Sequence, residues 1–485
     1  MPDGLDAAAA AAGGPPAAVR VVQVELARGV GPVWTGGRYA AVQALVRHRG
    51  TPVGWVRVPC DGRVELSADV VREAVERQLG PRLPALVYGP AGQAPPTPPS
   101  DELPPITVVV CTRDRPELLD ACLTALAAID YPDYEVLVVD NGAPGAGAAQ
   151  RAVRRGARYV REVRPGLDWA RNRGLAAAQH DLVAFTGDDA RPDPGWLRAL
   201  GAAFADPAVM AVTGPVAPLE LETPAQEYRA HVLDDRARGF VRRRLRRAEL
   251  SDAELLAARD FGAGANMAFR RSVFDDVRPF DPALDAGTAS AGGGDLELLH
   301  RLVARGHTLV YEPAALVWRL HARDASTLRR RISDDACGFA SYLYTCWRNH
   351  TVTRGAIARF YLGWVVSSVL RRLVRPGRHR RGLVLRELAG VALSPFRYRA
   401  ARHRARRVAG MPRGARGTPA RIPAIDDAGA PSSLPAELGH RRDASVAALA
   451  PAADGARGDG GRGDGGRAAE PRTPDSRAPL GEATP

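Results

Sequence analysis

The middle of the chain alternates short apolar runs with longer polar stretches. Residues 106–111, 135–140 and 182–186 form near-continuous apolar runs, and residues 158–161 form a weaker one. A strand that is covered on both faces of a parallel sheet has this continuous pattern rather than strict alternation. The runs begin 23 to 29 residues apart, which is the spacing of βαβ units. The pattern therefore predicts an α/β fold with an open, mostly parallel sheet.

The composition changes several times on either side of this pattern. Segments rich in Ala, Gly, Pro and Arg cannot pack a core, whereas β-like runs followed by an amphipathic stretch predict a small α+β module. The predicted order is a disordered segment (1–18), an α+β module (19–88), a proline-rich linker (89–105), the α/β domain (106–325), a helical Arg-rich region (326–408) and a disordered tail (409–485).

Polar side chains follow three of the predicted strands. Thr112 comes after the first apolar run, Asp140 closes the second, and Asp188 and Asp189 come after the run at 182–186. The ligand crevice of an open parallel sheet lies at the carboxyl ends of its strands, and a pair of carboxylates there suits a divalent cation. The alternative is that the two acids cap the helix that follows.

The charged residues exclude several kinds of chemistry. All 67 basic residues are arginine, because the chain contains no lysine. A P-loop lysine, a Schiff-base lysine and a kinase-type ATP lysine are therefore impossible.

The cysteines and the apolar runs bear on the compartment. Five cysteines without any CxxC pair favour neither a disulfide framework nor a zinc site and indicate a reducing compartment. Residues 1–18 lack the pattern of a secretory signal. No uninterrupted apolar run reaches the roughly 18 residues of a membrane span. We therefore expect a cytoplasmic protein.

Six short segments together resemble the family 2 glycosyltransferases of the GT-A fold. Each segment alone is a weak signal, but their order along the chain is specific, and the resemblance covers about residues 104–325. The segments are 106–114, 135–141, 170–174, 188–190, 264–266 and 294–297.

The resemblance implies a nucleotide-diphosphate sugar as donor and a Mg²⁺ or Mn²⁺ ion that neutralises the leaving diphosphate. Asp188 and Asp189 match the last two positions of the family's DxD element, whereas Gly187 stands at its first position and leaves one carboxylate fewer. His321 matches a histidine that often completes the metal or diphosphate site. The residues assigned to the donor are Thr112, Arg113, Asp114, Asp140, Asn141, Arg171, Asn172, Asp188 and Asn266, and those assigned to the metal are Asp188, Asp189 and His321.

The resemblance also implies a general base that takes the proton of the acceptor hydroxyl. Asp295 follows three glycines at the start of a predicted helix and is the candidate. Because Gly294 replaces the acid that the family commonly shows there, Glu297 is a second candidate. The alternative for either acid is to complement the dipole of the helix.

The Arg-rich region suggests a further partner. Residues 371–407 hold thirteen arginines and one acid, Glu387, and follow an aromatic, apolar stretch. We expect residues 356–407 to bind an anionic membrane surface. Nucleic acid, the alternative partner, is not expected, because the aromatic residues precede the basic run instead of interleaving with it.

The predicted function is therefore an inverting transfer of a single sugar to an acceptor hydroxyl, at the inner face of the cell membrane. The acceptor is a lipid-linked molecule, a cell-envelope glycan or a small molecule. Two alternatives remain open, a catalytically degenerate GT-A domain that acts as a membrane-surface scaffold and a nucleotidyltransferase.

Overall fold

The computed structural model describes residues 18–84, 99–145, 147–230, 239–366 and 381–409. Residues 1–17, most of the predicted linker, ten residues of the Arg-rich run (371–380) and residues 410–485 lie outside the described part of the chain. The predictions of disorder at the two ends are therefore not addressed by the structure.

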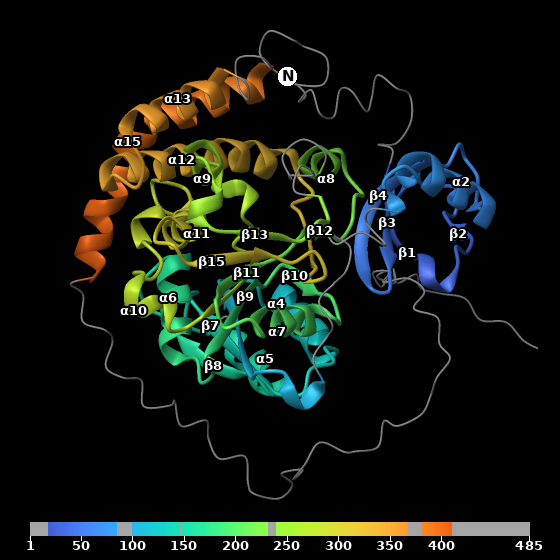
Figure 1. Ribbon diagram of the computed structural model, residues 1–485, viewed down its shortest axis with the longest axis horizontal. Coiled ribbons are helices and arrows are strands. Elements are labelled where there is room, and N and C mark those ends of the chain that lie inside the picture. The colour runs from blue at the N-terminus through green and yellow to red at the C-terminus, as the bar shows by residue number, and fades with distance from the viewer. Residues whose placement is uncertain (1–17, 85–98, 146, 231–238, 367–380, 410–485) are drawn as a thin grey trace, which may run out of the picture. The chain divides into compact units, whose positions relative to one another are not determined.

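The core of the domain is a mixed sheet of eight strands in the order β13-β15-β11-β14-β9-β6-β7-β8. Strands β9, β6, β7 and β8 pair in parallel, as do β11 and β15, whereas β14 and β13 run antiparallel to their neighbours. The predicted open, mostly parallel α/β sheet of the GT-A type is confirmed (Figure 1). The bounds are β6 Ile106–Thr112, β7 Tyr134–Asp140, β8 Arg158–Arg161, β9 Leu182–Gly187, β11 Val209–Thr213, β13 Arg243–Leu245, β14 Asn266–Arg270 and β15 Thr308–Tyr311.

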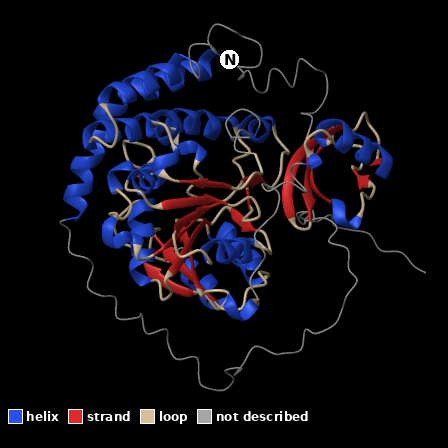
Figure 2. Ribbon diagram, in the orientation of Figure 1, coloured by secondary structure: helices blue, strands red, loops and turns tan. Residues whose placement is uncertain are grey.

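Helices cover both faces of this sheet, as Figure 2 shows. Successive residues of β6 enter different cores: Val109 packs with α6 and α11, whereas Val108 and Val110 pack with α4 and α7. Side chains of a strand point alternately to the two faces, so a strand that is covered on both sides must be apolar throughout. The helices of the domain are α4 Pro116–Ala127, α5 Ala148–Arg154, α6 Leu167–Ala177, α7 Trp196–Phe204, α8 Pro224–Tyr228, α9 Asp252–Leu256, α10 Val273–Asp276 and α11 Gly294–Ala304.

A small second sheet, β10-β16-β12, follows directly after the acid pair. Strand β10 (Ala190–Pro192) pairs antiparallel with β16 (Val317–Arg319), and β16 pairs in parallel with β12 (Val216–Pro218). Arg319 stands opposite Ala190 in this register. The second sheet therefore brings residues near position 320 beside Asp188 and Asp189.

The part before the domain has its own core, whereas helices after the domain share a core with it. The N-terminal part packs α2 (Ala68–Leu79) on the sheet β1-β3-β4 and adds the pair β2-β5. Its strands are β1 Val19–Glu25, β2 Val33–Trp34, β3 Ala41–His48, β4 Thr51–Pro59 and β5 Glu65–Leu66. The C-terminal part consists of α12 Ala325–Asn349, α13 Arg354–Trp364 and α15 Arg381–Ala409. Among the described residues, none of these helices combines the length and the apolar character that crossing a membrane requires.

Candidate active site

Asp188 and Asp189 follow the carboxyl end of β9, beside the end of β6. The Thr112 hydroxyl donates to Asp188 Oδ2 at 2.9 Å, and Arg115 Nη1 donates to Asp188 Oδ1 at 3.4 Å. Burial raises the pKa of Asp188, although the charge of Arg115 opposes this. The predicted neighbours Thr112 and Asp188 are thus brought together across two strands of the sheet.

Asp189 is held by an arginine from the second sheet. Arg319 Nε donates to the two carboxylate oxygens at 3.2 and 3.1 Å, and its Nη2 donates to Oδ2 at 3.0 Å. Burial alone would raise the pKa of Asp189, but the charge and hydrogen bonds of Arg319 lower it below its usual value. Arg331 and Arg115 act in the same direction. The acid pair is therefore surrounded by guanidinium groups.

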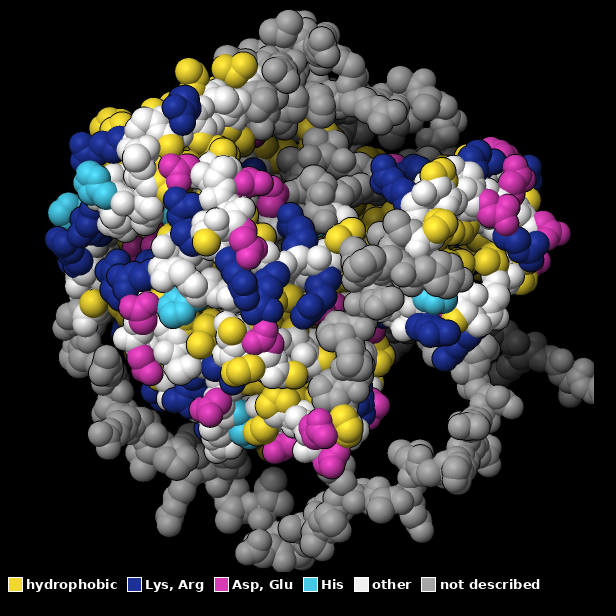
Figure 3. All heavy atoms as spheres, viewed as in Figure 1, with side chains coloured by type: hydrophobic (Ala, Val, Ile, Leu, Met, Phe, Trp, Pro, Cys, Tyr) yellow, Lys and Arg dark blue, Asp and Glu magenta, His cyan; other side chains and the backbone are white. Residues whose placement is uncertain are grey.

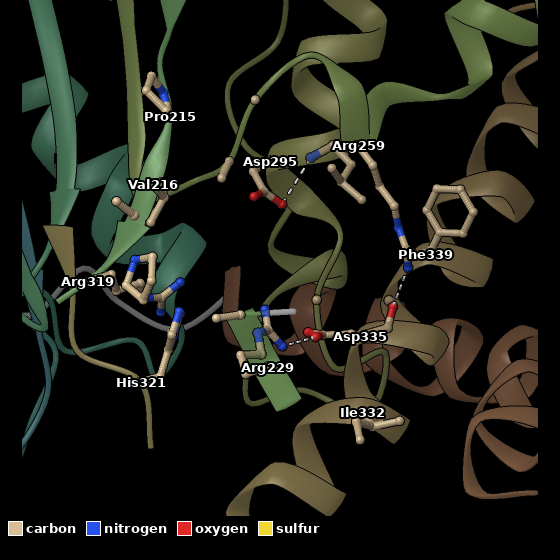
Figure 4. A pocket seen from close by; sticks show the side chains of 18 of the residues that line it. Pro215, Val216, Arg229, Arg259, Asp295, Arg319, His321, Ile332, Asp335 and Phe339 are labelled. Atoms are coloured by element: carbon tan, nitrogen blue, oxygen red, sulfur yellow. Dashed lines mark hydrogen bonds and ion pairs between the residues drawn. The ribbon is translucent and has the colours of Figure 1, made fainter. Parts of the chain in front are cut away.

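This arrangement does not by itself form a metal site. Among the described residues, no three His, Cys, Asp or Glu side chains lie together in a way that could hold a metal ion. His321 lies beside Arg319 (Figure 4) in the wall of the same cavity. A divalent cation at Asp189 would replace Arg319, because two positive charges at one carboxylate repel each other. The metal site at Asp188, Asp189 and His321 stays a prediction.

The residues predicted for the nucleoside lie at the ends of β6 and β7. Asp140 accepts hydrogen bonds from Gly142 N–H (2.8 Å) and from the Tyr159 hydroxyl (2.9 Å). Asp114 accepts one from Ala143 N–H at 2.8 Å and is exposed, as is Arg113. The carboxylates of Asp140 and Asp114 therefore shape the loop after β7. The exposed side chains of Arg113 and Asp114 border this loop.

Three predicted asparagines bind backbone groups. The Asn141 amide donates to the carbonyls of Glu162 and Arg164, and that of Asn172 donates to the carbonyl of Phe280. Asn266 is completely buried; it donates to the carbonyls of Pro215 and Ala315, and its Oδ1 accepts from Trp196 Nε1. Their amides hold loops of the site together, and their contact with a donor stays a prediction.

Asp295 faces a cavity of about 550 Å³. It is the first charged residue of α11, and Figure 4 shows its carboxylate across the cavity from Arg319 and His321. Gly264 N–H donates to Asp295 Oδ2 at 2.8 Å, and Leu296 N–H donates to Oδ1 at 3.0 Å. Each carboxylate oxygen thus accepts one backbone hydrogen bond, and the side chain lines the cavity.

Glu297, the second candidate base, lies elsewhere. It is buried and forms an ion pair with Arg301, with donor–acceptor distances of 2.9 and 2.8 Å. Arg301 also donates to the carbonyls of Arg278 and Pro279. Of the two acids, only Asp295 lines the cavity, so the geometry favours Asp295 as the base.

Two buried acids behind Asp295 were not predicted from the sequence. Arg171 Nη1 donates to Asp168 Oδ1 at 2.9 Å, and Leu167 N–H donates to Asp285 Oδ1 at 2.8 Å. Burial raises the pKa of Asp168 well above its usual value, and that of Asp285 to about 7. Only Asp168 had a local signal, since it lies one helical turn before Arg171. Asp285 contacts a helix 118 residues away in the chain.

Comparisons with known proteins find glycosyltransferases. Residues 107–278 match the family model described as Glycosyl transferase family 2. A protein of Mycobacterium tuberculosis strain H37Rv, named pre-mycofactocin glycosyltransferase, is 32% identical over 269 residues, which are 54% of this chain and 50% of that protein. Glycosyltransferase AglE of Haloferax volcanii is 26% identical over 217 residues, 43% of this chain and 64% of AglE. The chain thus spans about half to two thirds of the length of these curated relatives.

Solved structures give more distant matches. A mannosyltransferase of Pyrobaculum calidifontis, determined in complex with GDP-Man and Mn²⁺, is 16% identical with a TM-score of 0.42 and covers 65% of this chain and 93% of its own. TarS of S. aureus is 13% identical with a TM-score of 0.38 and covers 62% and 87%. Both likenesses are too remote to bear on substrate or metal.

Proposed function

We propose that this chain, whose residues 107–278 match the model of family 2 glycosyltransferases, transfers a single sugar from a nucleotide-diphosphate sugar to an acceptor hydroxyl. The observation that carries the proposal is the position of Asp295. Its carboxylate lines a cavity of about 550 Å³ together with Arg319 and His321. Such a cavity offers a base on one wall and cationic groups on another.

The proposed reaction inverts the configuration of the sugar. Asp295 takes the proton from the acceptor hydroxyl while that oxygen attacks the anomeric carbon and the bond to the diphosphate breaks. A carboxylate is a suitable base when it is held in place within hydrogen-bond reach of the hydroxyl. The hydrogen bonds from Gly264 and Leu296 orient the Asp295 carboxylate, and each of its oxygens keeps a lone pair that can accept from the acceptor hydroxyl.

The leaving diphosphate requires a positive partner. Arg319 lines the cavity beside Asp189, and a planar guanidinium group binds phosphate oxygens in pairs. We therefore assign Arg319 to the diphosphate. A Mg²⁺ or Mn²⁺ ion is the alternative partner of the diphosphate that the sequence predicts. Because arginines hold Asp188 and Asp189, the proposed reaction assigns no step to a metal ion.

The acceptor is the least defined partner. A lipid-linked molecule, a cell-envelope glycan and a small molecule all present the required hydroxyl. Because the M. tuberculosis relative is named after pre-mycofactocin, pre-mycofactocin is the first acceptor to test.

Binding at an anionic membrane surface is a separate proposal, and α13 and α15 support it. Leu385, Leu393 and Phe396 of α15 are exposed by 55, 45 and 68%, and at 100° per residue they lie within about 80° of one another around the helix. Figure 3 shows apolar and basic side chains intermixed over α13, where Leu362 is 64% exposed. Exposed apolar side chains beside arginines are typical of helices that lie on anionic lipid.

The experiment that tests the catalytic proposal measures nucleoside diphosphate released from UDP-glucose, GDP-mannose and dTDP-glucose, with and without Mn²⁺. We expect release by the wild-type protein with at least one donor and a loss of at least tenfold in D295N. The matched control is D276N, because Asp276 is an exposed acid that pairs with Arg305 and His307 outside the cavity.

Two outcomes would contradict the proposal. Equal release by D295N, D276N and wild type would favour the degenerate scaffold domain. Release of pyrophosphate in place of a nucleoside diphosphate would favour the nucleotidyltransferase.

A further inference from the structure

A buried network of charges lies directly behind the candidate base. Asp168 and Arg171, both on α6, are 1 and 9% exposed. Arg171 Nη1 donates to Asp168 Oδ1 at 2.9 Å, and the guanidinium carbon lies 5.2 Å from the centre of the Phe280 ring. Arg171 is thus fixed by a carboxylate and by an aromatic face.

The second terminal nitrogen of Arg171, Nη2, contacts the loop that binds Asp295. Arg171 Nη2 donates to the Gly264 carbonyl at 3.1 Å, and the N–H of the same glycine donates to Asp295 Oδ2 at 2.8 Å. A Cβ at position 264 would lie 2.5 Å from Arg171 Nη2 and 2.6 Å from Asp295 Oδ2. Only glycine therefore allows one residue to connect the two side chains at these distances.

The network also explains Gly294, where the sequence departs from the family. A Cβ at position 294 would collide with Asp168 Oδ2, so the Asp168 carboxylate occupies the space that a side chain at the start of α11 would take. Asp285 in turn caps the N-terminus of α6, because its Oδ1 accepts from Leu167 N–H at 2.8 Å. Oδ2 atoms of both acids are buried without a hydrogen-bond partner. The Asp168 carboxylate and Arg171 hold each other through their hydrogen bond of 2.9 Å.

We propose that Arg171 and Asp168 are positioning residues for the base: Asp168 fixes Arg171, and Arg171 fixes the Gly264 peptide groups that orient the Asp295 carboxylate. This inference rests on the proposed function, because it requires Asp295 to act as the base. It gives Arg171 a different role from the donor contact that the sequence suggested. Arg171 lies behind Asp295, and the cavity is lined by Ala263 and Asp295 in front of it.

The experiment compares R171M, D168A and D168N in the donor-release assay, with the donor among UDP-glucose, GDP-mannose and dTDP-glucose that the wild-type protein hydrolyses fastest. R171M and D168A should lower kcat by about 10- to 100-fold, the cost of a base displaced by about 1 Å, with the donor KM changed by less than about threefold. D168N should retain most of the activity, because its Oδ1 still accepts from Arg171.

R270M is the matched control. Arg270 donates to the carbonyls of Val209 and Phe204, and its guanidinium carbon lies 5.6 Å from the centre of the Phe204 ring, so it shares the carbonyl and aromatic contacts of Arg171. It lies at the end of β14 away from Asn266. A kcat for R270M within about threefold of wild type is expected.

The double variant R171M/D295N decides between positioning and direct contact. If Arg171 acts only through Asp295, the double variant should be no slower than D295N alone, because interactions within one unit are not additive. If R171M slows D295N as much as it slows wild type, or raises the donor KM by tenfold or more, Arg171 contacts the donor and the inference is wrong. If D295N itself is as active as wild type, the proposed function fails first.

Discussion

Replacing Asp285 by Asn should remove a loss of stability that the wild-type protein shows as the pH rises toward neutral. Asp285 is completely buried, and burial raises its pKa from 3.8 to about 7. For an acid with a raised pKa, the folded state binds the proton more tightly than the unfolded chain. The contribution of Asp285 to the free energy of unfolding is therefore most favourable at low pH. It decreases as the pH rises above about 4, and the decrease is complete above about pH 7.

The size of the effect follows from this shift. The rise in the pKa of Asp285 from 3.8 to about 7 corresponds to a total change of about 4 kcal/mol in the free energy of unfolding, since one pKa unit is about 1.4 kcal/mol. Between pH 5 and pH 8 the wild-type protein should lose about 2 to 3 kcal/mol of this amount. The D285N variant has no such titration, and its side-chain oxygen can still accept from Leu167 N–H.

The assay is urea unfolding of both proteins at several pH values from 5 to 8. The difference in unfolding free energy between D285N and wild type should move in favour of the variant by about 2 to 3 kcal/mol across this range. D324N is the control, because hydrogen bonds from Ser326 and Thr327 lower the pKa of Asp324; its titration ends below pH 5, so its curve should run parallel to wild type. Parallel curves for D285N would refute the reasoning.

Three further variants test other contacts. R319Q should bind Mn²⁺ about fivefold more tightly than wild type by electron paramagnetic resonance, because removing an ion pair worth about 1 kcal/mol releases Asp189; unchanged affinity would show that Arg319 and the metal do not compete. L393S/F396S should bind phosphatidylserine vesicles at least about tenfold more weakly than wild type, since two apolar side chains are lost. The control W34S changes a 60% exposed tryptophan outside α15 and should bind like wild type. Equal binding by wild type, L393S/F396S and W34S would end the membrane proposal. N266A should lower the free energy of unfolding in urea by about 3 kcal/mol, because it leaves Trp196 Nε1 and two carbonyls unpaired. A decrease below about 1 kcal/mol would contradict the role of Asn266 in connecting these loops.

The sheet could be predicted because its signal is local. Strands β6, β7 and β9 are apolar along most of their length, and the acids at positions 188 and 189 follow β9 directly. The position of Asp295 was also accessible, because three glycines precede it at the start of α11. In such cases the residues that define the feature are neighbours in the chain.

The hydrogen-bond and ion-pair partners of the site residues could not be predicted, because they come from distant parts of the chain. Asp189 and Arg319 are 130 residues apart, and Arg171 and Gly264 are 93 apart. An asparagine that binds backbone carbonyls has the same sequence signal as one that binds a ligand, so the roles of Asn141, Asn172 and Asn266 depend on the fold. The sequence predicted a set of site residues and left open which of them face the cavity.

Gly294 shows why a departure from a family pattern needs the structure before it is interpreted. From the sequence, the missing side chain at this position suggests a weakened catalytic site, because one acid fewer precedes Asp295. In the structure a buried carboxylate from another helix, that of Asp168, fills the same space and connects through Arg171 and Gly264 to the Asp295 carboxylate. An acid from α6 thus lies where a side chain at position 294 would begin. The substitution at position 294 therefore gives no reason to consider the domain degenerate, and the activity of D295N relative to wild type decides that question independently of it.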